Sequence, residues 1–396
     1  MCPFVVCPTK LVKTDFKSFQ KPTLQIRRRF TDFVFLYKNL ASDYPECGVP
    51  PLPDKQRMEY VRGDRFGSDF TNRRAHSLSR FLRRLTLHPV LRRSAVLVIF
   101  LESPDWNSHM RLRPGRSPSG SESVFDNFAD TFVNAFSKVH KPDKRFIEVR
   151  DKSDKLDEDL GHVEKIVARV ARREADLETD YADLATQFLR LAILEPGVEL
   201  EVHSFAKGIE DTSRGLTDLK ETTDQDYLTS LKDMEAYSGA LKGLLKTREQ
   251  KQLDFEGLTE YLAKAVQDRD TLASTHGSSA LTSPTGFLRS KLEDVRGVDH
   301  EAARRDRIRK LELQIDRLTR EVEDARLTAE RFDEEVIREV ADFERIKAAE
   351  FRDTLGTLAK AHVEFYERMA STWEDYVESM DKALVEETGR QLQAQG

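Results

Sequence analysis

A seven-residue apolar repeat near the C-terminal end constrains the fold of this chain most strongly. Apolar side chains recur there in alternating steps of three and four, at Ile308, Leu311, Ile315, Leu318, Val322, Ala325, Ala329, Phe332 and Val336. This heptad spacing is typical of a helix that packs along another helix. Looser repeats occur earlier, so we expect three long helices, over roughly residues 142–194, 197–272 and 300–386.

Helices of this length exclude a single globular core. At about 1.5 Å per residue, segments of roughly 50 to 85 residues would run roughly 75–130 Å. Such helices must pack side by side, and a second copy is their natural partner. We therefore predict an all-α, elongated three-helix bundle over residues 142–390 that serves for dimerisation.

The N-terminal region differs from this bundle in charge and in periodicity. Residues 21–101 hold 16 Lys and Arg against 7 Asp and Glu, whereas residues 102–396 hold 45 against 62. We expect strands at Leu11–Lys13 and Thr23–Phe30, and helices at Asp32–Ser42, from Asp69 to His88, and at Ser94–Leu101. Residues 1–105 are thus predicted to form a small α+β domain whose basic charge favours a nucleic acid or a membrane as partner.

The composition argues against several classes of protein. No stretch of 18 apolar residues predicts a membrane span, and the first twenty residues do not match a secretory signal. Cys2, Cys7 and Cys47 give neither a disulfide framework nor a zinc spacing, which favours the cytosol. The chain has no His-Glu-x-x-His pair, Walker-type glycine loop or Gly-x-Ser-x-Gly motif, so we expect no catalytic residue, metal or cofactor.

Three basic motifs follow one another in the N-terminal domain. They are Arg27-Arg28-Arg29-Phe30-Thr31-Asp32-Phe33, then Pro50-Pro51-Leu52-Pro53-Asp54-Lys55, then Arg73-Arg74 on the helix that ends at His88-Pro89. Arginine offers planar, bidentate donors to phosphate, and lysine offers a point charge on a flexible stem. Over residues 11–103 this ordered set resembles the PX (phox homology) domain, a phosphoinositide-binding module.

The resemblance implies a role for each of four residues. Arg29 would bind the 3-phosphate, Phe30 would form the floor under the inositol ring, Lys55 would meet the 1-phosphate, and Arg74 would hydrogen-bond the ring hydroxyls. This pattern favours phosphatidylinositol 3-phosphate. Arg73 takes the place of Arg74 if the register shifts by one residue, and the alternative for Phe30 is a place in the core.

Other residues in and around these motifs are expected to have no direct role in binding. Arg27 and Arg28 are interpreted as solvated surface charges, and Phe33, Leu36, Leu78 and Phe81 as core. A PX domain opens with three antiparallel strands, and the region before Leu11 does not match the first of them. Loss of that edge strand would expose unpaired backbone groups, so the resemblance puts the stability of the domain in question rather than its pocket.

A second segment, residues 123–141, follows a linker expected over residues 106–122. Four phenylalanines share one apolar stripe there: Phe125, Phe128, Phe132 and Phe136. A short amphipathic helix of this kind suits shallow insertion into a bilayer interface. Packing onto the bundle or the basic domain is an equal alternative, because Asp126 and Asp130 would be repelled by anionic lipid.

The order of these parts resembles the PX-BAR sorting nexins, and particularly the fungal sorting nexin-4 (autophagy-related) group. The motifs that carry this further resemblance are Tyr60-Val61-Arg62-Gly63-Asp64-Arg65-Phe66, Ser103-Pro104-Asp105-Trp106-Asn107, Val124-Phe125-Asp126-Asn127-Phe128-Ala129-Asp130 and His140-Lys141-Pro142-Asp143. In that family the BAR domains form crescent-shaped dimers that favour curved membranes.

The family resemblance also implies partners and a location. It implies a peripheral protein on phosphatidylinositol 3-phosphate membranes, as a homodimer or as a heterodimer with a related BAR-domain sorting nexin. Its roles would be retrieval of cargo such as SNAREs from endosomes to the Golgi, and selective autophagy with autophagy proteins, including cytoplasm-to-vacuole transport. The expected locations are the cytosol, the endosome membrane and the preautophagosomal structure membrane.

Some alternatives stay open at this point. Basic clusters on the bundle, among them Lys242/Lys246/Arg248, would face either lipid or, as we favour, solvent. A coiled-coil interaction scaffold without lipid specificity is the alternative function. We do not expect nucleic-acid binding, because the aromatic residues near the arginines match core positions.

Overall fold

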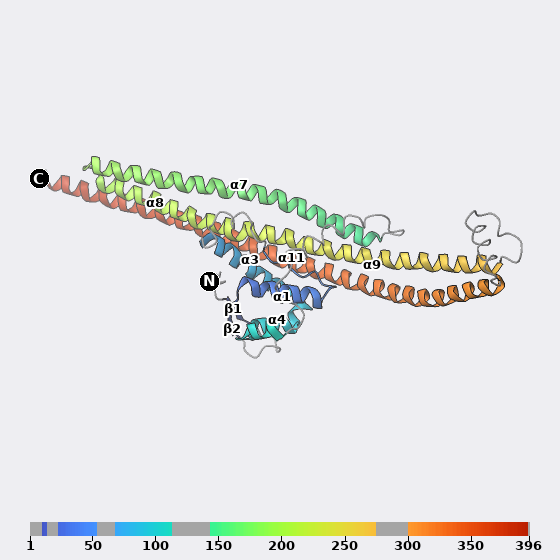
Figure 1. The fold of residues 1–396 in the computed structure, drawn as a ribbon. Helices are drawn as coiled ribbons and strands as arrows, with labels where there is room; N and C mark the ends of the chain where they lie inside the picture. Colours follow the sequence, from blue (N-terminus) through green and yellow to red (C-terminus); the bar gives the residue numbers. More distant parts are fainter. Residues whose placement is uncertain (1–9, 14–22, 54–67, 113–142, 275–299, 395–396) are drawn as a thin grey trace. The chain divides into compact units, whose positions relative to one another are not determined.

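The computed structural model describes residues 10–13, 23–53, 68–112, 143–274 and 300–394. The chain divides into two compact units, one of residues 1–118, 151–241 and 340–396, and one of residues 119–150 and 242–339. The three expected long helices are present (Figure 1). They are α7 (Lys144–Leu194), a second helix made of α8 (Glu199–Glu221), the π-helical segment η2 (Thr222–Leu228) and α9 (Thr229–Ser274), and α11 (His300–Ala394).

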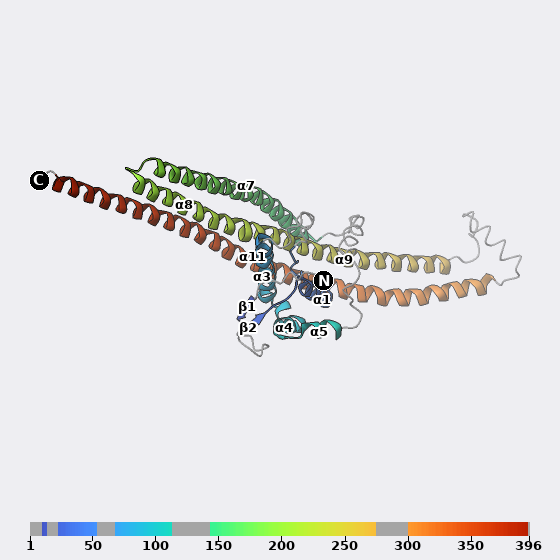
Figure 2. The same cartoon turned by 60° about the vertical axis from the view of Figure 1, so that its left-hand side comes forward.

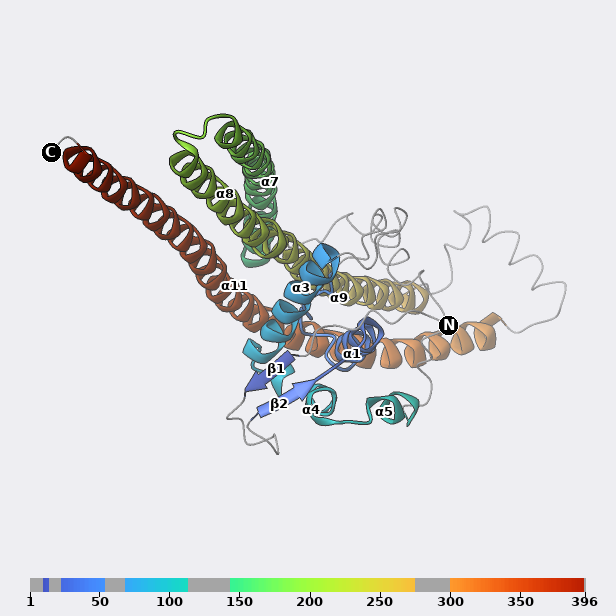
Figure 3. The ribbon, with the colours of Figure 1, turned by 90° about the vertical axis from the view of Figure 1, so that its left-hand side faces the viewer.

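The N-terminal part of the first unit combines two short strands with helices. Strands β1 (Lys10–Lys13) and β2 (Thr23–Ile26) pair antiparallel, with Lys10 opposite Ile26 (Figure 3). The helical elements are α1 (Phe30–Asp43), α3 (Ser68–Leu87), the 3-10 turn η1 (Leu91–Arg93), α4 (Ala95–Glu102) and α5 (Trp106–Leu112). The prediction of a strand through Phe30 was wrong, because the strand ends at Ile26 and helix α1 begins at Phe30.

An apolar core holds α1, α3 and α4 together. The side chains of Phe33, Leu36, Leu78 and Phe81 are buried, as the sequence predicted. Phe33 meets Phe100 edge to face with ring centroids 5.0 Å apart, and Phe100 meets Trp106 at 5.1 Å. Because Trp106 opens α5 and belongs to this core, ordered structure continues past residue 105 into the segment expected to be a linker.

Helices α7 and α8 run side by side in the first unit, as both Figure 1 and Figure 2 show. The Lys220 ammonium pairs with the Glu178 carboxylate at 2.7 Å, and the ring of Phe188 meets that of Phe205. Against α11, α8 presents glycines. A Cβ atom at Gly208 would lie 3.3 Å from the ring of Trp373, and one at Gly215 would lie 3.1 Å from Phe365.

In the second unit, parts of α9 and α11 share an apolar and ionic contact. Ala329, Phe332 and Val336 of the predicted heptad repeat are buried. Arg248 makes two hydrogen bonds to the Asp333 carboxylate, at 2.6 and 2.8 Å, and its guanidinium lies 4.1 Å from the ring centroid of Phe146. The solvated-face interpretation is therefore wrong for Arg248, whose side chain is buried in this contact.

Among the described helices, none combines the length and apolar composition needed to cross a bilayer.

Candidate functional site

Two of the residues singled out in the sequence meet where α1 begins beside α3. The guanidinium carbon of Arg74 lies 4.6 Å from the ring centroid of Phe30, in a cation–π contact. Arg74 is buried, Phe30 is half-buried, and Arg29, the residue before Phe30, is exposed. The structure therefore joins an aromatic ring, a buried cation and an exposed cation within one small region.

The start of α1 is fixed by a reciprocal contact between Arg29 and Asp32. The Asp32 carboxylate accepts a hydrogen bond from the backbone N–H of Arg29 at 2.8 Å, and the Asp32 N–H donates to the Arg29 carbonyl at 2.9 Å. Asp32 is buried, and its negative charge in the first turn complements the helix dipole. This contact explains why the helix begins at Phe30, and it holds the backbone of Arg29 in an extended conformation.

Arg28 has a structural role that the sequence interpretation missed. Its guanidinium donates to the carbonyl of Phe100 at 3.0 and 2.7 Å and to the carbonyl of Ser103, and so satisfies the end of α4. It also lies over the rings of Phe100 and Trp106, at 5.4 and 5.8 Å. Burial lowers the pKa of Arg28, although the Asp32 charge acts in the opposite direction. Arg28 is therefore not a solvated charge, whereas Arg27 is exposed.

The adjacent residues Arg73 and Arg74 contact different partners. Arg73 donates to the Asp224 carboxylate of η2 at 2.6 Å, whereas Arg74 lies against Phe30. The position beside the aromatic ring thus belongs to Arg74 and not to its neighbour.

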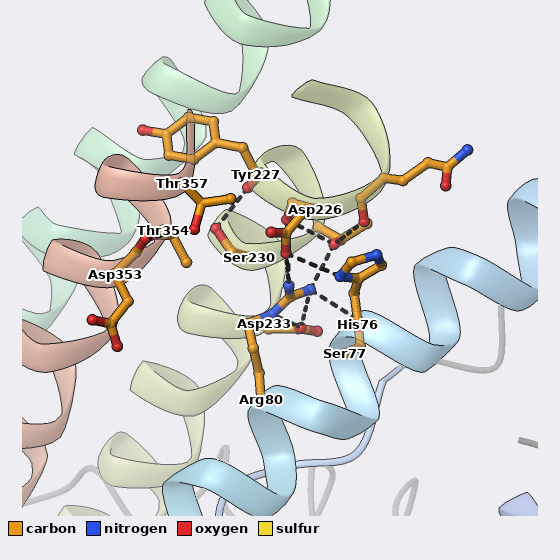
Figure 4. A network of polar contacts seen from close by, with 12 residues as sticks. His76, Ser77, Arg80, Asp226, Tyr227, Ser230, Asp233, Asp353, Thr354 and Thr357 are labelled. Atoms are coloured by element: carbon orange, nitrogen blue, oxygen red, sulfur yellow. Dashed lines mark hydrogen bonds and ion pairs between the residues drawn. The ribbon is translucent and has the colours of Figure 1, made fainter. Parts of the chain in front are cut away.

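A further set of α3 side chains reaches the long helices, and of its members only Arg73 was singled out from the sequence, as the alternative to Arg74 at the lipid site. We call it the docking face of α3, and it comprises Arg73, His76, Arg80 and Arg84. Figure 4 shows two of its members, His76 and Arg80. Its members recur at intervals of three and four residues, which places them along one side of a helix. This spacing was the only sign of the docking face in the sequence. It was not enough to predict a contact, because a basic helix face is usually solvated.

The docking face meets acidic residues of η2, α9 and α11. Arg80 contacts the carboxylates of Asp226 and Asp233 at 2.6 and 2.8 Å, and Arg84 contacts Glu350 at 2.6 and 2.7 Å. Burial raises the pKa of Asp226, but the hydrogen bond from His76 and the charge of Arg80 outweigh it, and the pKa is lowered overall. Burial likewise lowers the pKa of Arg84, but the charge and hydrogen bonds of Glu350 raise it overall.

Five other predicted site residues lie outside the described part of the chain. They are Lys55 and the four phenylalanines of the predicted amphipathic helix, Phe125, Phe128, Phe132 and Phe136. Their roles stay predictions.

Comparison with known proteins agrees with this architecture. The family model of the PX domain matches residues 16–104. A solved cryo-EM structure of the SNX-BAR Mvp1 tetramer superposes with a TM-score of 0.59 over 93% of this chain and 94% of that chain. At 16% sequence identity this likeness concerns the fold alone, and it supports a PX domain followed by a BAR-like helical bundle.

Curated relatives match over nearly the whole chain. Sorting nexin-4 of Emericella nidulans is 68% identical over 379 residues, which cover 93% of this chain and 78% of the relative. Sorting nexin-4 of Saccharomyces cerevisiae is 39% identical over 380 residues, which cover 94% of this chain and 87% of the relative. On this identity and coverage, the chain belongs to the sorting nexin-4 family.

Proposed function

We propose that this chain is a phosphatidylinositol 3-phosphate-binding sorting nexin that dimerises and senses or tubulates curved endosomal membrane. In this proposal it acts in endosome-to-Golgi retrieval of cargo such as SNAREs and, at the preautophagosomal structure membrane, in selective autophagy and cytoplasm-to-vacuole transport. A PX domain joined to a BAR-like fold implies phosphoinositide binding and membrane remodelling, and the matched families indicate a lipid-binding adaptor rather than a catalyst.

The observation that carries the lipid proposal is the Arg74–Phe30 contact beside the exposed Arg29. A head group of this kind needs cations for its phosphates and an apolar surface for its ring. Arg29 offers bidentate donors for the 3-phosphate, the half-buried ring of Phe30 offers the floor, and Arg74 offers donors for the hydroxyls. Lys55 completes the proposed set at the 1-phosphate.

An exposed apolar stripe on α7 supports the dimer. Every seventh residue along this helix is a large apolar side chain with 40 to 46% of its surface exposed: Val163, Val170, Leu177, Leu184 and Leu191. A sustained seven-residue repeat is the pattern by which helices pair. We propose that a second copy, or a related BAR-domain sorting nexin, covers this stripe and so presents two lipid sites together.

The proposal also includes insertion into the bilayer interface by four phenylalanines, Phe125, Phe128, Phe132 and Phe136.

Liposome flotation tests the lipid proposal. The purified chain should float with vesicles that contain phosphatidylinositol 3-phosphate and much less with vesicles that lack it. Arg29→Ala should remove that difference while the thermal melt stays nearly unchanged, because Arg29 is exposed. Arg27→Ala, which removes an exposed charge two residues away, is the matched control. Equal recovery of the wild type on both vesicles would favour the interaction scaffold.

A further inference from the structure

Helix α3 contacts two different parts of the first unit with neighbouring residues. Arg74 lies against Phe30 at the proposed lipid site, while the docking face binds the long helices. We propose that Arg80 and Arg84 are positioning residues for lipid binding, because they anchor α3 to the bundle and thereby hold Arg74 beside Phe30. The identity of the ligand in this inference rests on the proposed function.

Arg80 is held from several directions. Its guanidinium contacts the carboxylates of Asp226 and Asp233 (Figure 4). It also donates to the hydroxyl of Thr229 at 2.6 Å. The side chain of Arg80 is only 8% exposed. A charge buried to this degree depends on its carboxylate partners, because without them it would lie uncompensated away from water.

Arg84 is anchored more deeply. Its guanidinium forms a two-pronged pair with the buried Glu350 carboxylate, at 2.7 and 2.6 Å, and donates to the carbonyl of Asp233 at 2.8 Å. Its guanidinium carbon also lies 5.0 Å from the ring centroid of Tyr237. Glu350 belongs to α11 and Asp233 to α9, so this one side chain links α3 to two long helices at once.

The π-helical segment η2 is the part of the bundle shaped for this contact. A π turn interrupts the regular hydrogen bonding of a helix and is frequently found at functional positions. Here the carbonyl of Asp226 accepts from the Thr229 hydroxyl at 3.0 Å and from Arg80 at 3.4 Å. The same segment supplies the carboxylates that receive Arg73 and Arg80. The irregular turn therefore supplies acceptors that α3 uses.

The link to the lipid site is short and continuous. Arg73 and Arg74 are adjacent, and Arg84 lies ten residues further along the same helix, roughly 15 Å away. If undocking makes α3 spend most of its time away from Phe30, the apparent affinity falls in proportion to the competent fraction. A fall of that fraction to a tenth would weaken head-group binding by about tenfold.

The test uses the full chain and soluble inositol 1,3-bisphosphate, so that membrane curvature and dimer avidity do not enter. Calorimetric titration gives the affinity, and hydrogen exchange reports whether α3 is docked. Glu350→Gln should raise amide exchange in α3 and weaken binding by about tenfold. Arg84→Met combined with Glu350→Leu replaces the buried pair by apolar groups and should restore both readouts to within about threefold of wild type.

Two further variants keep the result interpretable. Arg83→Gln removes an exposed ion pair between Arg83 of α3 and Asp353 of α11, and it should change affinity by less than about twofold because an exposed pair contributes little. Asp226→Asn is the milder disruption if Glu350→Gln does not fold, and it should weaken binding in the same direction.

Each contrary result has a distinct meaning. Unchanged affinity in Glu350→Gln overturns the inference, whether or not exchange in α3 rises, because the apolar core then holds Arg74 in place without the ion pair between Arg84 and Glu350. Failure of the wild type itself to bind inositol 1,3-bisphosphate would instead remove the proposed lipid function.

Discussion

The apolar core of the N-terminal domain and the docking face of α3 are both buried, but they are built from opposite kinds of side chain. The core joins aromatic rings such as Phe33, Phe100 and Trp106 edge to face. The docking face joins Arg80 and Arg84 to carboxylates from three other elements. Apolar contacts are non-directional and each contributes by area, whereas a buried ion pair stabilises only while both partners are present.

The largest effect should follow from opening the core. Phe100→Ala removes a fully buried ring that contacts both Phe33 and Trp106, and it should cost about 3–5 kcal/mol of unfolding free energy. Urea unfolding followed by tryptophan fluorescence measures the loss. Val90→Ala is the control, since Val90 is 43% exposed and should lose little. Equal losses in the two variants would show that this cluster does not hold the domain together.

A smaller but more specific effect should follow from breaking the ion pair on one side. Glu350→Leu alone leaves Arg84 buried with a carbonyl as remaining partner, and it should cost about 3 kcal/mol. Adding Arg84→Met should recover most of the loss, because two apolar groups then replace the pair. A complete double-mutant cycle by thermal unfolding checks this; a double variant less stable than Glu350→Leu would contradict it.

Removing Arg28 should cost less again. Arg28→Met keeps much of the apolar stem against Phe100 and Trp106 but loses the donors to the carbonyls that end α4. We expect a loss of about 1–3 kcal/mol by the same unfolding assay. The exposed Arg27→Met is its neighbour control, and a similar loss there would show that the effect is not due to capping α4.

The smallest effect, and the only gain, is expected at Glu174. Burial raises the pKa of this carboxyl against the weaker opposing effects of His362 and Thr223, and its buried Oε2 atom has no hydrogen-bond partner among the described residues. Ionisation of Glu174 therefore costs stability as pH rises above about 4.3, the ordinary value for Glu. Glu174→Gln should melt slightly higher than wild type at pH 7, and this gain should shrink as pH falls towards 4. A lower melting temperature at pH 7 would contradict the assignment.

These regions also differ in how far the sequence predicts them. The apolar core positions and the three long helices can be predicted from the spacing of apolar residues within one continuous stretch of the chain. Arg84 meets Glu350 across 266 positions, and no local pattern distinguishes such a buried arginine from a solvated one. The interval of eight residues between the apolar Leu219 and Tyr227 also fits a regular helix, so it does not reveal the π turn.

The proposed lipid site lies between these extremes. The motif resemblance selected Phe30 and Arg74 together, and the structure places them in contact. It also selected Arg29, which is exposed, but it grouped Arg28 with Arg27 as a solvated charge, whereas the guanidinium of Arg28 is used within the domain. Three consecutive arginines carry the same chemistry, and only the end of the neighbouring strand and the start of α1 decide that Arg28 turns into the domain while Arg27 and Arg29 are exposed.

The two glycines of α8 fix the alignment of that helix against α11. Gly208 and Gly215 are one heptad apart, and each leaves a notch that an aromatic ring of α11 occupies, Trp373 in one and Phe365 in the other. Sliding either helix along the other would drive a ring into a neighbouring side chain at both places. The two contacts together therefore fix the axial position of α8 along α11, so this stretch of the bundle tolerates bending more readily than sliding of one helix along the other.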